Sequence, residues 1–187
     1  MLRRLALTWC IGVLSLALAA AAAAKDAPAP AGAAVLTVVG NIGQTNRPPF
    51  NTFQDPFFAY HERSFEKAYA FDLAMLEALG MHRATIAYEG WPRALEIEGP
   101  LLRDVLAATG AAEGTVATVA LDGFATELTP ADLTAEDWIV AIKEGGRYLG
   151  IGQRGPAWVL YARRDGKTAT AEDEARWPWA VFLIEVR

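Results

Sequence analysis

The sequence has almost no cysteine. Cys10 is the only one among 187 residues. A disulfide needs two thiols, and structural metal sites built on thiolates need several. Cys10 also lies in an apolar N-terminal run that we expect to be removed on export. The mature chain is therefore predicted to use neither a disulfide nor a thiolate.

Serine and histidine are nearly as rare. The chain has two serines, Ser15 and Ser64, and two histidines, His61 and His82. Without a G-x-S-x-G motif, a Ser-His-Asp hydrolase is not predicted. Neither histidine has the spaced cysteines or carboxylates that would complete a metal site. We expect His82 at the end of a helix, where a cation interacts well with the helix dipole.

Runs of basic residues are also missing. The chain has 17 lysines and arginines against 22 aspartates and glutamates, a formal net charge of −5 at pH 7. Binding to nucleic acid or to an anionic membrane surface needs a positively charged patch. The composition therefore argues against both and leaves a small ligand or a protein as the partner.

The N-terminus carries a sorting pattern. Arg3 and Arg4 precede an apolar run over residues 5–18, and three alanines precede Lys25. A charged start, an apolar centre and a small-residue cleavage site in this order are typical of a secretory signal peptide. An uncleaved membrane anchor is the alternative, because the apolar run is long. We predict cleavage near Lys25 and a periplasmic protein.

Composition divides the chain into three parts. We predict a signal peptide over residues 1–24, a flexible Ala/Pro-rich spacer over 25–34 and one folded domain over 35–187. A domain of this size buries roughly 70% of the surface of its unfolded chain, which is enough for a core without disulfides.

Hydrophobic spacing predicts many short strands and few helices. We expect one helix after the N-cap residue Asp72, a second with Pro100 at its first position, and a helical turn after Pro130. The aromatic-rich stretch 41–63 is expected to be an ordered loop. Strands are expected over residues 35–40, 83–88, 94–98, 115–121, 125–128, 138–143, 157–161 and 181–186. The grouping of these elements predicts an α+β fold with a mixed, mainly antiparallel sheet.

Residues 150–155 match the dinucleotide pattern G-x-G-x-x-G. That motif binds a pyrophosphate because it opens a helix, whereas here Pro156 and a strand-like run follow, so we reject a nucleotide site. Two interpretations remain open: a plain hairpin connection, or a loop that brings backbone amides and Arg154 to a ligand. Four arginines stand beside proline or glycine features, and we favour Arg154 among them: Arg47, Arg93, Arg103 and Arg154.

The mature chain is rich in tryptophan. Trp138 and Trp158 lie in apolar strands and are predicted to be core residues. Trp91 precedes a proline, and Trp177 and Trp179 flank another, so these three are candidates for stacking on a flat ligand. A purely structural role as aromatics at the rim of the fold fits each of them equally well.

Five blocks of sequence, taken in order, resemble a known fold family. They comprise residues 71–79, 98–106, 120–124, 154–158 and 184–186. Together they resemble small exported members of the sulfite-oxidase (oxidoreductase molybdopterin-binding) fold, over essentially the whole of residues 35–187. The order of the blocks is specific, whereas each block alone is not.

This resemblance implies a function. Enzymes of the family hold molybdenum through a cysteine thiolate, and the mature chain has none, so we expect no molybdenum. Cysteine-less members include the PruR-type periplasmic pterin-binding proteins, which the chain resembles in length, signal peptide and the loop at Asn46 and Arg47. The resemblance implies a non-catalytic protein that binds a reduced pterin and modulates a membrane-bound cyclic-di-GMP enzyme through its periplasmic domain.

Residue chemistry then suggests a ligand site. A pterin needs an aromatic face, an acid or amide, and an arginine. The candidate ligand-binding residues are Arg47, Trp91, Asp122, Arg154, Trp177 and Trp179. Two alternatives stay open: a molybdopterin-dependent oxidoreductase of the same fold, and an interaction module that binds no small molecule.

Overall fold

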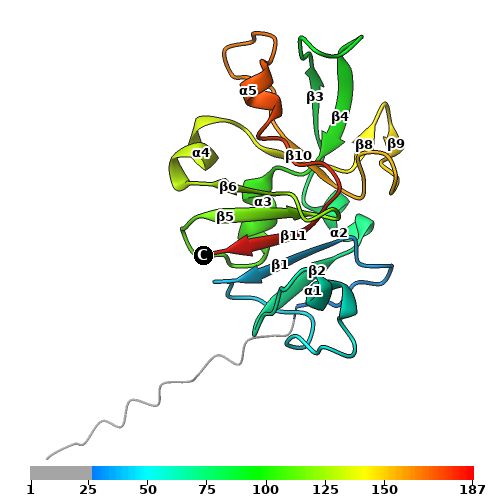
Figure 1. Cartoon of the computed structure of the whole chain (residues 1–187), viewed down its shortest axis with the longest axis vertical. Helices are drawn as coiled ribbons and strands as arrows, with labels where there is room; N and C mark the ends of the chain where they lie inside the picture. Colours follow the sequence, from blue (N-terminus) through cyan, green and yellow to red (C-terminus); the bar gives the residue numbers. More distant parts are fainter. Residues whose placement is uncertain (1–26) are drawn as a thin grey trace, which may run out of the picture.

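The computed structural model of the protein describes residues 27–187 (Figure 1). The predicted signal peptide and the first two spacer residues lie outside the described residues. Residues 27–34 form no helix or strand, but two hydrogen bonds tie them to the domain. Gly32 N donates to Asp72 Oδ2 at 2.7 Å, and Asn46 Nδ2 donates to Pro28 O at 3.0 Å. Within 27–187, no helix has the length and apolar character needed to cross a membrane.

The domain is built from short elements. In chain order they are β1 (Leu36–Gly40), α1 (Pro56–Tyr60), β2 (Ala68–Phe71), α2 (Leu73–Ala78), β3 (His82–Ile86), β4 (Leu95–Gly99), α3 (Leu102–Ala108), β5 (Val116–Ala120), β6 (Ala125–Leu128), α4 (Pro130–Ala135), β7 (Ile139–Ala141), β8 (Lys143–Glu144), β9 (Arg147–Tyr148), β10 (Trp158–Leu160), α5 (Ala171–Glu174) and β11 (Val181–Val186).

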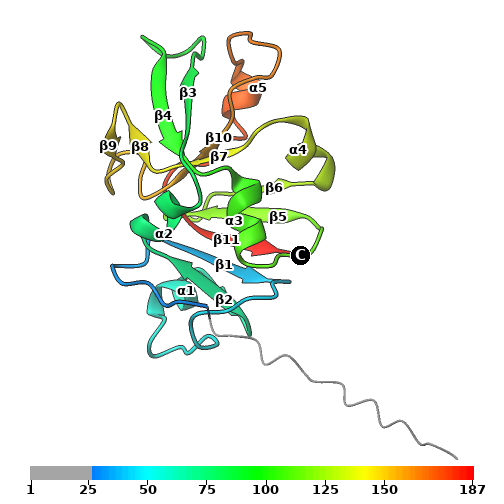
Figure 2. The same cartoon turned by 180° about the vertical axis from the view of Figure 1, so that it is seen from behind.

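The main sheet has five strands in the order β2-β1-β11-β5-β6. The pair β1 and β11 is parallel, and the other neighbours are antiparallel. Two smaller sheets, β3-β4-β8-β9 and β10-β7, are antiparallel and lie at one end of the main sheet (Figures 1 and 2). The predicted α+β class with a mixed, mainly antiparallel sheet is confirmed.

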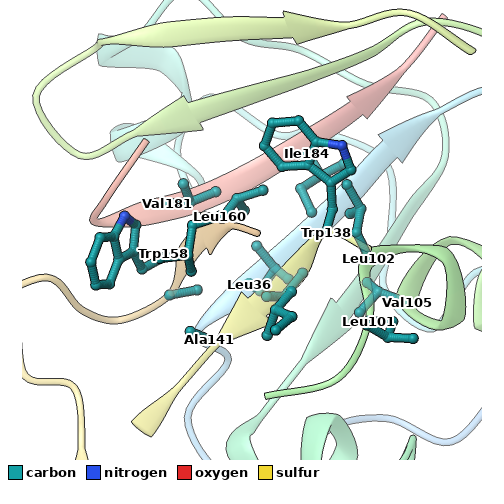
Figure 3. Close-up of a cluster of buried hydrophobic side chains, with 14 of the residues drawn as sticks. Leu36, Leu101, Leu102, Val105, Trp138, Ala141, Trp158, Leu160, Val181 and Ile184 are labelled. Carbon is teal, nitrogen blue, oxygen red and sulfur yellow. The ribbon is translucent and has the colours of Figure 1, made fainter. Parts of the chain in front are cut away.

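Both faces of the main sheet are buried, except at the edge strand β6. On one face, Leu36, Val38 and Ile184 join a core that includes Trp158 and the apolar side of α3 (Figure 3). On the opposite face, a smaller cluster is covered by the chain around α1; its buried members are Val39, Phe65, Ala68, Val119, Phe182 and Leu183. Side chains of a strand alternate between faces, so one strand serves both clusters. This explains why the sequences of β1, β5 and β11 are nearly continuous apolar runs.

Helix α2 begins and ends as its sequence predicts. The Asp72 side chain accepts a hydrogen bond from Met75 N at 2.8 Å, and these bonds to backbone N–H groups of Gly32 and Met75 keep the pKa of Asp72 below its usual range. Gly80, just after the helix, has a φ of +99°, which favours glycine.

Helix α3 is also confirmed, although its start differs from the prediction. Leu101 is the N-cap, so Pro100 precedes the helix rather than occupying its first turn. Pro100 O instead accepts a hydrogen bond from Val140 N at 2.8 Å, which ties this segment to β7.

Five further points of the sequence prediction need correction. The stretch 41–63, expected to be a loop, contains the one-turn helix α1 with Pro56 in its first turn. Strand β2 was not predicted; all four of its residues are buried, so it lacks the alternation that marks a half-exposed strand. Helix α5 and strand β9 were also missed. His82 is the first residue of β3, not the end of a helix.

Candidate ligand-binding site

A hollow of about 810 Å³ lies beside the small sheets, and we call it the tryptophan pocket. Three segments that are distant in sequence form it: the loop between β3 and β4, the stretch from β8 to β10, and the stretch from the end of α5 to Trp179. Its lining residues are Trp91, Glu144, Arg147, Tyr148, Leu149, Gln153, Arg154, Trp158, Glu174 and Trp179.

Indole rings form one side of the pocket. Trp158, on β10, is buried, and its ring centroid lies 5.5 Å from that of the half-buried Trp91. Trp179 is 47% exposed, so its ring is free for contact with a ligand. Aromatic rings at such spacings favour offset or tilted packing, and a flat ligand can extend the same arrangement.

Arg154 lies across these rings. Its guanidinium carbon is 4.8 Å from the ring centroid of Trp158 and 5.6 Å from that of Trp91, which is cation–π geometry. Nη1 also donates to Glu144 Oε2 at 3.2 Å. Of the five N–H groups on this guanidinium, this is the only one with a hydrogen-bond partner within residues 27–187, so the others can donate to a ligand.

The glycine-rich loop fixes the position of Arg154. A Cβ atom on Gly155 would lie 2.3 Å from Leu149 O, so only glycine allows the loop to close on itself at this point. The backbone of Arg154 is held as well, since its carbonyl accepts from Ala180 N at 2.9 Å. The loop leads into β10 and not into a helix, in keeping with the rejection of a nucleotide site.

Helix α5 presents a carboxylate to the pocket. Thr170 caps the helix in a capping box with Asp173, and Glu174 follows in the same turn. The Glu174 side chain is half-buried, and no partner for its carboxylate occurs in the described part of the chain. It is therefore available to accept hydrogen bonds from a ligand.

The hairpin of β8 and β9 is anchored to helix α2. Tyr148 Oη donates to Glu77 Oε1 at 2.8 Å, and Lys143 Nζ lies 2.5 Å from the same oxygen. The bond from Lys143 lowers the pKa of Glu77, and the bond to Glu77 raises the pKa of both Lys143 and Tyr148. These contacts hold the hairpin that carries Glu144 and Arg147.

A second hollow of about 210 Å³ adjoins the first. Glu174 and Trp179 line both, and Asp122 and Trp177 line only the smaller one. Trp177 is 2% exposed, and its Nε1 has no hydrogen-bond partner among the described residues. Asp122 Oδ1 accepts from Phe124 N at 3.0 Å within its own turn.

The structure brings most of the predicted site residues together, but not all. Trp91, Arg154 and Trp179 line the tryptophan pocket, and Asp122 and Trp177 line the hollow next to it.

Arg47 lies elsewhere, in the loop beside β2, where it pairs with Asp55. Its guanidinium carbon also lies 4.9 Å from the ring centroid of Phe65, so its visible role is structural.

Sequence reasoning missed the two acids of the pocket. Glu144 is a polar residue in a two-residue strand, and no local pattern distinguishes it. Glu174 had a partial signal, because Thr170 and Asp173 match the spacing of a capping box. That pattern identifies the helix but not the pocket that the helix faces.

The donor set does not suit a thiolate-held molybdenum. Residues 27–187 contain no group of three or more histidines, cysteines, aspartates or glutamates placed to hold a metal ion. The one thiol of the chain, Cys10, lies outside this range.

Comparison with known proteins gives no family. Neither a protein-family model nor a curated protein matches the sequence.

Proposed function

We propose that this chain is an exported, non-catalytic pterin-binding protein. The observation that carries the proposal is the convergence of three groups on one pocket: exposed indole surface, the Arg154 guanidinium and the Glu174 carboxylate, which has no partner among residues 27–187. A pterin is flat, offers N–H donors on its aminopyrimidinone edge and has carbonyl and ring-nitrogen acceptors. A carboxylate matches the donors, and a guanidinium matches the acceptors.

The pocket supports a specific set of roles. Trp179 and Trp91 would contact the faces of the heterocycle, Glu174 would accept from the aminopyrimidinone edge, and Arg154 would donate to the carbonyl. Asp122, the acid suggested by the sequence, lines only the smaller hollow and bonds within its own turn. Glu174 is therefore the better candidate for the acid.

The resemblance to the sulfite-oxidase fold extends the proposal. It supports a periplasmic protein that reports pterin availability to the periplasmic domain of a membrane-bound cyclic-di-GMP enzyme. The alternative, a molybdopterin-dependent oxidoreductase of that fold, needs a thiolate ligand that this chain lacks after signal-peptide removal.

The first test is to recover the natural ligand. Mature protein is purified from the periplasm of its own host under reducing, anaerobic conditions and denatured, and the released small molecules are analysed by fluorescence and mass spectrometry. We expect a reduced pterin without stoichiometric molybdenum. An empty protein whose tryptophan fluorescence does not respond to added reduced pterins would contradict the proposal.

A further inference from the structure

The charged residues that line the tryptophan pocket are balanced. Two carboxylates, Glu144 and Glu174, stand against two guanidinium groups, Arg147 and Arg154. Sites that bind phosphate or carboxylate ligands rely on arginines whose charge is left for the ligand. Among the residues that line the pocket the two signs are equal in number, and Arg93, which lies behind Glu144 and does not line the pocket, is paired with that carboxylate. The lining therefore has no surplus positive charge to attract an anion.

Glu144 also occupies the place where a ligand anion would bind. Its Oε2 accepts from Arg154 Nη1 at 3.2 Å, and its Oε1 accepts from Arg93 Nη2 at the same distance of 3.2 Å. The Glu144 side chain is 22% exposed, so solvent screens it less than it screens a fully exposed carboxylate. A carboxylate between two guanidinium groups is the arrangement that arginine pairs make with anionic ligands, and here the protein supplies the anion itself.

This arrangement leaves Arg154 able to bind a neutral group. A carbonyl oxygen can accept from its remaining N–H groups without approaching Glu144 closely. A phosphate or carboxylate on the ligand would instead compete with Glu144 for Arg154 and be repelled by it. Arg147 has no ion pair in the described part of the chain, but it is exposed, so solvent and salt weaken its attraction for an anion.

We infer that Glu144 makes the tryptophan pocket selective for an uncharged flat ligand and against its phosphorylated or carboxylated forms. The inference rests on the proposed function and adds the charge class of the ligand. Glu144 acts in two ways: it positions Arg154 on the indole face, and it repels competing anions, which is specificity by exclusion of the wrong ligand.

The test compares 7,8-dihydroneopterin, a reduced pterin that is uncharged at neutral pH, with its monophosphate ester, by anaerobic tryptophan fluorescence titration. The wild-type protein should prefer dihydroneopterin by about tenfold or more, because the ester brings a like charge to Glu144. Glu144→Gln keeps the shape of the side chain but removes its charge, and should reduce this preference at least about fivefold.

The matched control is Glu98→Gln. Glu98 pairs with Arg83 at 3.1 Å on β4 and does not line the pocket, so this variant should keep the wild-type preference. Equal affinity of the wild-type protein for both compounds, or an unchanged preference in Glu144→Gln, would overturn the inference. Thermal unfolding of each variant checks that the fold is retained.

A second readout does not depend on pterin binding, so it separates failure of the inference from failure of the proposed function. Tryptophan quenching is measured with iodide, an anion, and with acrylamide, which is neutral. In Glu144→Gln the iodide quenching constant should rise about twofold relative to that of acrylamide, since a negative charge beside the indoles is gone. If neither pterin compound binds, the same rise still supports the anion exclusion, and an unchanged ratio overturns it.

Discussion

At the scale of single residues, the two tryptophans on either side of Pro178 have different roles despite their proximity in sequence. Trp179 is 47% exposed and lines the tryptophan pocket, whereas Trp177 is 2% exposed and packs against Tyr161 and Trp91. The sequence suggested the same stacking role for both. Burial separates them, because a ring enclosed by the core cannot offer a face to a ligand without local opening.

Replacing these two tryptophans should therefore have different effects. Trp179→Ala should weaken pterin binding by about fivefold, since aromatic stacking contributes about 1 kcal/mol, and should leave the unfolding free energy nearly unchanged. Trp177→Ala should lower the free energy of unfolding by about 3–5 kcal/mol, as expected for a large buried side chain. Denaturant unfolding and ligand titration of both variants test this. Equal stability losses would contradict it.

The two candidate arginines can be compared in the same way. Arg154→Ala should weaken pterin binding by about tenfold, because it removes both a hydrogen-bond donor and a stacking partner. Arg47→Ala should leave the affinity unchanged, because Arg47 packs on Phe65 and pairs with Asp55, away from the pocket. If both variants lose affinity in the titration, the prediction is contradicted and Arg47 contributes to the binding site.

One buried ionic group should set the acid sensitivity of the fold. Burial alone would raise the pKa of Asp173, but bonds from the Tyr161 hydroxyl, the Thr170 backbone N–H and Arg163 outweigh it and lower the pKa to about 2. The pKa of Asp173 is therefore lower in the folded state than in the unfolded state. The stabilisation is present at pH values above the unfolded-state pKa, and it is lost as the pH falls through the folded-state pKa.

The pH prediction follows from the direction of this pKa shift. Asp173→Asn should destabilise the protein by about 2–3 kcal/mol at pH 7, the value of a shift of nearly two pKa units. The difference between the two proteins should shrink between about pH 4 and pH 2. Urea unfolding of both across this range is the measurement. A difference that stays constant with pH would assign the stabilisation to packing instead of charge.

At the scale of elements, helices α4 and α5 provide a matched pair. Both begin with a threonine N-cap whose partner in the capping box is an aspartate three residues later. Only α5 carries a residue of the tryptophan pocket, Glu174. Loss of an N-cap typically costs about 1 kcal/mol.

Removing the two caps should therefore separate stability from binding. Thr129→Ala and Thr170→Ala should each lower the free energy of unfolding by about 1 kcal/mol. Only Thr170→Ala should also weaken pterin binding, because it loosens the turn that positions Glu174. Parallel titrations and denaturation curves check this. If the pterin affinity of Thr170→Ala is unchanged, the proposed role of Glu174 in binding is contradicted.

The elements also show where sequence reasoning succeeds. Strand β4 was predicted because its residues alternate between apolar and acidic, and α2 because Asp72 and Gly80 mark its ends. Strand β2 has no such marker, since burial of both its faces removes the alternation, and α1 is too short for a helical period. Local pattern predicts elements that have one exposed face or a capped end.

At the scale of the whole molecule, the pocket depends on contacts that no local pattern contains. Arg154 and Trp91 could be proposed from their neighbours in sequence, but Glu144 and Glu174 join them only because the β8–β9 hairpin and α5 lie at the same end of the sheet (Figure 1). The topology decides which residues of each type come together in the pocket. The types of residue in the site could therefore be predicted from the sequence, but its two acids, Glu144 and Glu174, could not.

The pocket and the main sheet should unfold together. One apolar cluster contains both Leu36 of the main sheet and Trp158, which forms a wall of the pocket (Figure 3). Strand β11 lies between β1 and β5, so the centre of the sheet pairs strands that are far apart in sequence. A shared core and a central strand with such distant partners favour a single cooperative transition.

Denaturant unfolding of the domain tests this prediction with two probes. Tryptophan fluorescence reports mainly on the pocket end, where Trp91, Trp158 and Trp179 lie, and far-ultraviolet circular dichroism reports on all the sheets. We expect both curves to have the same midpoint, and a bound pterin to raise both equally, because a ligand held only by the native state stabilises the whole cooperative unit. A fluorescence transition that precedes the other, or that alone responds to the ligand, would mean that the pocket end opens independently of the main sheet.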